Sequence, residues 1–358
     1  MSVETRQKQD EVANTPTVPQ VKGELPRWAP WVVLAAALIV VGGLLALVGF
    51  SVGLWIVLSA VVYAVAMYAI SRGVEGGRKA TDRLATILVT TAFLIALIPL
   101  VSVVIVVVQN GINRFDPAFF TQSMRGVIGD GGGGYHAVMG TLIITLLAAV
   151  ISIPVGVLTA IYLVEYAKGR LSRAITFLVD VMTGIPSIVA GLFAFALFAL
   201  FFGPSIRLGF AGAVALSVLM IPVVVRSTEE MLKIVPNELR EAAYALGTPK
   251  WRTIVKVVLR TAIAGITSGI TLAIARVIGE TAPLLIAVGL TIGVNFNPFS
   301  GRMATLPVFS YNSYIAPGVP REPFIDRAWT SALVLMIIVL VLNLIARLVA
   351  RAFAPKTR

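Results

Sequence analysis

Apolar runs of about 20 residues recur along this chain, and they constrain its fold more than any other feature. Because about 20 residues of α-helix cross the hydrocarbon of a bilayer, each run has the length of a membrane span. A secretory signal would instead be one short run near the N-terminus, followed by a cleavage site. The repeated runs therefore predict an all-α integral membrane protein, a polytopic helix bundle.

Composition agrees with a bilayer environment and excludes several chemistries. Hydrophobic residues make up 58% of the chain and charged residues 13%, a balance that no soluble domain of this size keeps. The chain has no cysteine, which excludes disulfides, cysteine-ligated zinc and thiol nucleophiles. A membrane-embedded enzyme would need a cluster of catalytic or metal-binding side chains, and the single histidine does not supply one. We therefore expect no catalytic residues and no metal site.

Eight spans are expected, with boundaries good to a few residues. They cover residues 30–49, 52–70, 84–108, 138–163, 174–202, 208–225, 261–289 and 330–350. The loops after the second, fourth and sixth spans are rich in Lys and Arg, whereas the alternate loops are poorer in them. Basic loops stay on the cytoplasmic side, so the even number of spans predicts that both termini are cytoplasmic. We therefore attribute the net charge of +12 to basic residues that set the topology and contact lipid, and we expect no nucleic acid partner.

The chain divides into a body and several appendages. We expect a disordered cytoplasmic tail at residues 1–29, an N-terminal transmembrane hairpin at 30–70 and a basic cytoplasmic tail at 351–358. The body, residues 84–350, has six spans that contain Gly, Pro and charged residues, which are costly in a membrane and usually functional. Its one histidine, His136, follows a glycine run and is expected to be a solvated outer-loop residue.

Residues 226–260 form a long cytoplasmic loop that begins with a short amphipathic helix. Asn237 is placed to cap this helix and Gly247 to end it. Its apolar face consists of Leu239, Ala242, Ala243 and Leu246, which follow the i, i+3, i+4, i+7 spacing. Small residues on that face allow close approach of another surface, and two interpretations follow: a docking helix or a plain amphipathic linker.

A second helix is expected to follow at once. Thr248 is placed to cap it and Pro249 suits its first position. Arg252, Lys256 and Arg260 then repeat every four residues and form a basic stripe. Such a stripe is typical of a helix that lies against lipid headgroups.

This loop resembles the EAA loop of ABC importer permeases. The resemblance rests on Glu241-Ala242-Ala243, Gly247 after three residues, and Val257 and Leu259 after nine more. Arg260 stands where the family usually has proline, which alters the edge of the motif and leaves its core. The resemblance implies that Glu241, Ala242, Ala243 and Gly247 couple the chain to a cytoplasmic ATPase. The chain has no G-x-x-x-x-G-K-[ST] phosphate loop, so we expect it to bind no cofactor, with ATP and Mg held by the partner.

The seventh span carries two charges at membrane depth. Arg276 lies about 22 Å from Thr261, where the span begins, and Glu280 follows it by four residues, a spacing that lets the two pair. An arginine at that depth costs at least about 2.5–3.5 kcal/mol. Two interpretations remain: a structural ion pair, or an anion pathway in which the guanidinium binds a tetrahedral oxyanion.

The segment from Arg276 to Leu285 resembles the phosphate importer permeases of the PstA type. Similar stretches are Gly140-Thr-Leu, Ile153-Pro-Val-Gly, Tyr162 to Tyr166, Asp180 to Ser187 and Leu306-Pro-Val, so the resemblance covers about 84–350. The hairpin at 30–70 extends beyond the usual six-span pattern. The resemblance implies a six-helix permease domain with Arg276, Glu280 and Thr281 in the phosphate pathway.

It also implies an assembly in the bacterial inner membrane. The partners would be a homologous permease of the PstC type, an ATPase dimer of the PstB type and an external phosphate-binding protein of the PstS type. The competing class is a stand-alone ion-coupled transporter or channel. It would use the charged, interrupted helices equally well, but it would not need the docking helix of the 226–260 loop.

Overall fold

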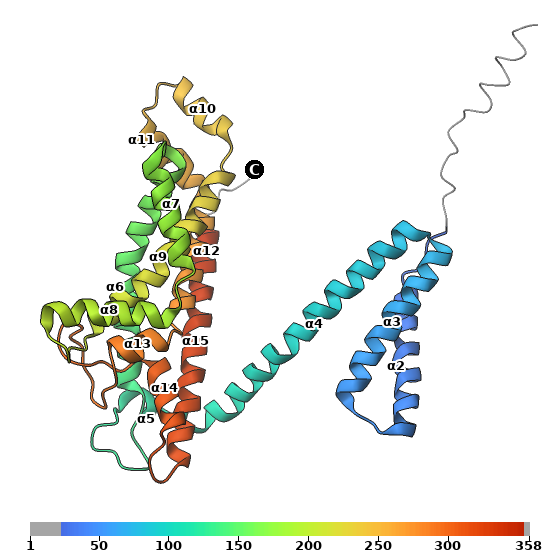
Figure 1. Cartoon of the computed structure of the whole chain (residues 1–358), viewed down its shortest axis with the longest axis horizontal. Helices are drawn as coiled ribbons and strands as arrows, with labels where there is room; N and C mark the ends of the chain where they lie inside the picture. Colours follow the sequence, from blue (N-terminus) through green and yellow to red (C-terminus); the bar gives the residue numbers. More distant parts are fainter. Residues whose placement is uncertain (1–22, 354–358) are drawn as a thin grey trace, which may run out of the picture. The chain divides into compact units, whose positions relative to one another are not determined.

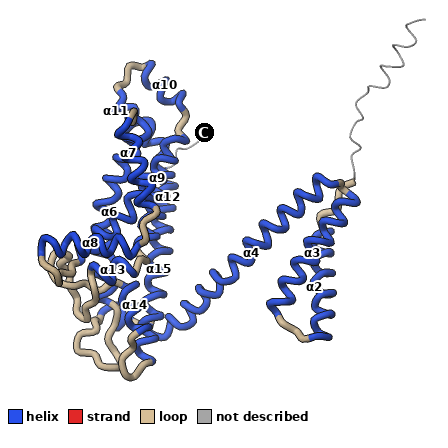
Figure 2. The backbone as a smooth tube through the Cα atoms, viewed as in Figure 1, coloured by secondary structure: helices blue, strands red, loops and turns tan. Residues whose placement is uncertain are grey.

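The computed structural model describes residues 23–353, all of whose regular secondary structure is helical (Figures 1 and 2). The chain forms two compact units, one up to Val103 and the other from Val104 onward. The predicted tails at 1–29 and 351–358 fall largely outside the described residues.

The first unit contains α2 (Ala29–Val48), α3 (Val52–Val74) and most of α4 (Gly77–Gly111). The helices α2 and α3 pack against each other as a hairpin, joined at Gly49, whose φ is +134°. Long apolar side chains cover much of their outer surface, as expected for helices whose solvent is lipid. The predicted third span begins earlier than the sequence suggested, at Gly77 instead of residue 84.

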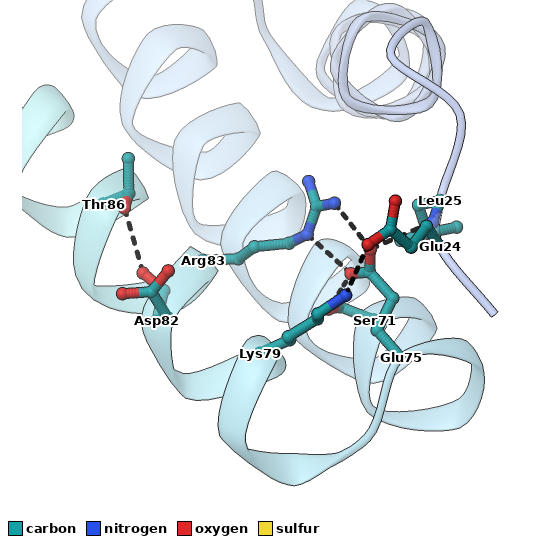
Figure 3. Close-up of polar contacts among 8 residues, drawn as sticks. All are labelled: Glu24, Leu25, Ser71, Glu75, Lys79, Asp82, Arg83 and Thr86. Atoms are coloured by element: carbon teal, nitrogen blue, oxygen red, sulfur yellow. Dashed lines mark hydrogen bonds and ion pairs between the residues drawn. The ribbon is translucent and has the colours of Figure 1, made fainter. Parts of the chain in front are cut away.

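A polar cluster closes the junction between α3 and α4 (Figure 3). Glu75 accepts from Arg83 Nε over 2.6 Å and from Arg83 Nη2 over 2.7 Å, a bidentate pair. Ser71 Oγ and the amide of Leu25 donate to the same carboxylate over 2.7 and 2.9 Å. The bonds from Arg83 are the main reason why the pKa of Glu75 falls from its ordinary value of 4.5 to about 2.

This cluster should loosen in acid. A carboxyl group with a lowered pKa stabilises the fold fully above its ordinary pKa, and this contribution disappears as the pH falls from about 4.5 to about 2. We expect hydrogen exchange at the Leu25 amide, corrected for its intrinsic pH dependence, to accelerate in that window. In Glu75→Gln the amide should exchange fast at every pH; an unchanged wild-type profile across the window would contradict the assignment.

The second unit is a bundle of long helices with several short ones. Its α-helices are α5 (Pro117–Thr121), α6 (Tyr135–Ile161), α7 (Arg170–Thr183), α8 (Ser187–Phe202), α9 (Gly209–Ile234), α10 (Asn237–Ala245), α11 (Lys250–Thr253), α12 (Leu259–Val277), α13 (Ala282–Ala287), α14 (Leu306–Ile315) and α15 (Glu322–Phe353). A 3₁₀ turn follows α4 at Ile112–Arg114, and π turns occur at Tyr162–Tyr166 and Ile254–Val258. Among the described residues, seven helices have the length and composition of a membrane span, or up to eight if one bent pair is a single span. The predicted fold class is confirmed.

The bent pair corrects the expectation of a continuous span at 174–202. The helices α7 and α8 meet at 108°, with Gly184 to Pro186 between them. Proline has no N–H to continue the helical hydrogen bonds, and its ring disfavours helical backbone at the preceding residue. The chain therefore turns, and α8 runs across the other long helices of this unit (Figure 1).

The expected seventh span is interrupted as well. Helix α12 ends at Val277, and the short α13 begins at Ala282 after an irregular stretch. Two glycines seat α13 against its neighbours. A Cβ on Gly191 of α8 would lie 2.5 Å from Pro283 Cα, and one on Gly212 of α9 would lie 2.2 Å from Val288 Cγ2. The neighbouring helices thus hold α13 in place, but they cover the interrupted backbone only in part: Ile278 is buried and Gly279 is exposed, so water or another protein must cover the rest in a bilayer.

Helix α9 is the centre of this unit. It packs against α6, α12, α8 and α7, and many of its side chains, such as Leu216, Met220 and Val224, are fully buried. The main apolar core joins these residues to Ile144 of α6 and Leu284 of α13. Any shift of α9 therefore affects both the interrupted region and the loop that α9 leads into.

The expectation for His136 is wrong. The side chain is only 2% exposed, lies in the first turn of α6 and meets Phe309 of α14 at a centroid distance of 5.0 Å. Helix α6 begins at Tyr135, earlier than the predicted residue 138, so His136 belongs to the packed helix and not to the glycine loop before it.

Candidate functional site

Helix α10 lies at one end of the second unit, away from α13 and α14 (Figure 1). It covers Asn237–Ala245 and ends as predicted, since Gly247 has a φ of +73°. The predicted caps are off by one residue. Pro236, not Asn237, is the N-cap of α10, and Pro249, not Thr248, is that of α11, because each proline holds the extended backbone that precedes a helix.

The apolar face of α10 is mostly uncovered. Only Ala243 of its four predicted residues is buried, whereas Ala242 and Leu239 are exposed and Leu246 is 86% exposed. Glu241 is exposed as well. A helix held in place with its apolar face in the open fits a docking element better than a linker that folds back on its own protein.

An ion pair ties α10 to the end of α6. Arg240 Nη2 donates to Glu165 Oε1 over 2.9 Å, and the two side chains are 13% and 5% exposed. The same guanidinium donates to the carbonyls of Val235 and Leu232 over 2.6 and 3.0 Å. Lys250 of α11 donates to the carbonyl of Glu165. Helices α10 and α11 are therefore both bonded to the same residue, Glu165.

Sequence reasoning missed this pair. Seventy-five residues separate the partners, so no helical spacing connects them. The available signal was that Glu165 lies within the Tyr162 to Tyr166 stretch, and Arg240 just before Glu241, both of which resemble the importer permeases.

A second ionic network joins α7 to the second half of α9, before α10. Arg226 donates to Asp180 of α7 and, over 2.8 Å, to Glu229 on its own helix. Lys233 donates to the other oxygen of Glu229 over 2.7 Å. Glu229 is buried with both oxygens satisfied, which is the condition for keeping a carboxylate there.

The predicted basic stripe is present. Arg252, Lys256 and Arg260 are all exposed along the segment from α11 through the π turn into α12. These exposed side chains are free to meet another surface, and their contact with lipid headgroups stays a prediction.

The Arg276–Glu280 pair expected from the spacing is not formed. Helix α12 ends at Val277, and the Glu280 amide donates to its carbonyl over 3.1 Å in a tight turn, so the two residues are not on one helical face. Arg276 is exposed in the last turn of α12. Glu280 and Thr281 are half-buried in the interrupted stretch before α13.

A further arginine, Arg327 of α15, was not anticipated. It is fully buried, and its Nη1 donates to the carbonyls of Gly129 and Gly131 over 2.9 and 2.8 Å. The guanidinium also lies 4.5 Å from the ring centre of Phe324. It fixes the glycine loop before α6, which the sequence alone indicated only as a loop.

Comparison with known proteins decides between the two classes that the sequence left open. Residues 152–358 match the family of binding-protein-dependent transport system inner membrane components. The chain belongs to this family. It is a multi-pass permease component of an ABC transporter in the inner membrane, and the ATPase is not this subunit.

Relatives extend the match across most of the permease. The phosphate transport system permease protein PstA 1 of Mycobacterium tuberculosis H37Rv is 48% identical over 277 residues, which cover 76% of this chain and 88% of that protein. PstA of Mycobacterium leprae is also 48% identical, over 76% of this chain and 90% of that one. PstA of Yersinia pestis is 38% identical over 79% of this chain and 93% of that protein. The predicted PstA-type resemblance is confirmed.

Among solved structures, the permease is similar to a chain of the inward-facing MetNI methionine ABC transporter. The TM-score is 0.48, and the identity is 22% over 62% of this chain and 94% of that one.

We expect Arg240→Gln to weaken coupling in the assembled permease complex. The change leaves Glu165 buried without its cation, which costs about 3–5 kcal/mol, and releases α10 from α6. Transport per ATP hydrolysed by the purified complex should fall at least about tenfold, and Glu165→Gln should behave alike. Lys79→Gln, which breaks an ion pair whose two partners are 51% and 79% exposed, is the control and should change little. Wild-type coupling in both pair variants would contradict this role.

Proposed function

We propose that this permease carries inorganic phosphate from an external binding protein into the cytoplasm, driven by ATP hydrolysis on separate subunits. The support is the identity of 48% over most of the chain to permeases named for phosphate transport. The observation that carries a pathway role for Arg276 is its position, exposed at the end of α12 and next to an interrupted stretch in which Gly279 is exposed as well.

An exposed Arg276 argues for a second permease subunit. Facing lipid at that depth, the side chain would cost at least about 2.5–3.5 kcal/mol, so the surface around it must meet protein or water. A homologous permease of the PstC type, packed on this surface, would turn it into one wall of a shared pathway. Alternating access between two such walls would then carry the anion.

The chemistry of the stretch suits a phosphate anion. The guanidinium of Arg276 is always charged and offers forked N–H donors that match two phosphate oxygens. Among the described residues it has no ion-pair partner, so its donors are available. The carboxylate of Glu280 lies four residues on and would compete with bound phosphate, which favours release, and the Thr281 hydroxyl offers a further hydrogen bond.

The 226–260 loop would transmit the ATPase cycle. Glu241, Ala242 and Ala243 lie on α10, and Gly247 turns the chain toward α11. We propose that α10 docks on an ATPase dimer of the PstB type, which holds the ATP and Mg, while a PstS-type protein delivers phosphate at the opposite end. This arrangement requires α10 and both termini to be cytoplasmic, as the basic loops predict. Co-purification of the tagged chain tests the arrangement, and ATP-dependent phosphate uptake by the purified complex tests the substrate.

We expect Arg276→Gln to abolish phosphate uptake, by about a hundredfold or more, without loss of the assembled complex. Glutamine has a similar shape but neither the charge nor the forked donors. Uptake of labelled phosphate into proteoliposomes measures the effect, and co-purification of the ATPase reports assembly. Uptake at the wild-type rate would exclude Arg276 from the pathway.

Gly247→Val should detach or uncouple the ATPase. Gly247 has a φ of +73°, which a β-branched residue adopts only with strain, so the turn after α10 would reorganise. We expect less ATPase to co-purify, or ATP hydrolysis without transport. Gly43→Ala is the matched control, because Gly43 has ordinary helical backbone and no atom within 4 Å of an added Cβ. An intact, fully active complex that carries the Gly247→Val change would count against α10 as the coupling element.

A further inference from the structure

Two arginines from distant parts of the chain lie against one glycine just after α13. A Cβ built on Gly289 would lie 3.1 Å from Arg207 Cδ, 3.2 Å from Arg207 Nη1 and 3.5 Å from Arg302 Cδ. Gly289 has a φ of +76°, and its lack of a side chain lets both arginines come close. Arg207 is half-buried before α9, and Arg302 is exposed in the segment before α14.

No carboxylate balances these two charges. Neither arginine forms an ion pair with an Asp or Glu of the described part of the chain. The two stretches that supply Arg207, Gly289 and Arg302, residues 181–228 and 281–321, contain no Asp or Glu. Two neighbouring guanidinium groups repel each other, and a bound anion removes that repulsion.

The backbone that presents Arg302 is held in place. Asn295 Nδ2 donates to the carbonyls of Ser300 and Arg302 over 2.7 and 3.1 Å. The amide of Phe210, in the first turn of α9, donates to the carbonyl of Pro298 over 2.8 Å. This segment is therefore fastened to the helix that Arg207 precedes, and the two arginines belong to one ordered site.

The site lies next to the proposed pathway. Arg276, Glu280 and Thr281 precede α13, and Gly289 follows it, so the two groups are separated along the chain by a helix of six residues, about 9 Å long. From the glycine end, an anion would meet Arg207 and Arg302 before it reached Arg276.

We propose that Arg207 and Arg302 form an anion-binding site that receives phosphate at the end of the pathway opposite α10. The inference rests on the proposed function, because it assigns the first contact of the same substrate. The two arginines hold the dianion after its release from the binding protein and pass it along α13 to Arg276.

The test uses the complete complex in proteoliposomes, with phosphate-loaded binding protein outside and ATP inside. In Arg207→Gln/Arg302→Gln, phosphate uptake should fall at least about tenfold, while stimulation of ATP hydrolysis by the loaded binding protein stays unchanged. Arg207→Lys/Arg302→Lys keeps both charges and should retain most of the uptake. Arg321→Gln, at an exposed arginine on the segment between α14 and α15, is the matched control and should behave as wild type.

Two outcomes would overturn the site. Undiminished uptake in the double Gln variant means that the charges do not act on phosphate. Loss of stimulated ATP hydrolysis together with uptake means that the arginines dock the binding protein or maintain the fold. Gly289→Ala gives an independent readout that removes no charge, since its Cβ would crowd Arg207, whose Cδ and Nη1 lie 3.1 and 3.2 Å away, and it should lower uptake severalfold. A wild-type complex without ATP-driven phosphate uptake would instead refute the proposed function, whatever the variants do.

Discussion

The close approach of α13 to α8 and α9 is the contact on which the rest of the second unit depends. A chain that leaves the helical conformation inside a bilayer exposes backbone groups, which is tolerated only where protein or water covers them. Gly191 and Gly212 allow that cover, because a larger residue at either position would push α13 away. This packing fixes where the chain resumes as a helix after the interrupted stretch from Ile278 to Thr281.

The same packing links the two ends of the unit. Helix α9 contacts α13 through Gly212 and leads through Pro236 into α10. Around its last turns, Arg226 and Glu229 join it to α7, and the Arg240–Glu165 pair joins α10 to α6. A displacement of α10 by an ATPase would thus act on helices that also shape the interrupted stretch, which gives the coupling a continuous physical route.

Local patterns in the sequence predicted much of this arrangement. The apolar runs located the spans, and Gly247 and the apolar spacing around Glu241 to Ala243 located the short helix and its turn in the 226–260 loop, because these signals are local and periodic. Predictions from helical spacing were wrong where a helix ends. Arg276 and Glu280 are four residues apart, but α12 stops at Val277, so the expected pair does not form. The prediction that His136 is a solvated loop residue was wrong for a related reason, since α6 begins one residue before it and its side chain is buried.

The sequence by itself determined that this chain crosses a membrane through many helices; a loop for a cytoplasmic partner and an arginine at membrane depth are its further predictions. These follow from hydropathy, charge and short motifs, which act within a few turns of helix. Only the tertiary structure decided the bend between α7 and α8, the Arg240–Glu165 link and the meeting of Arg207 with Arg302 at Gly289. Each of these depends on which distant segments share a contact, and that is set by how the helices pack.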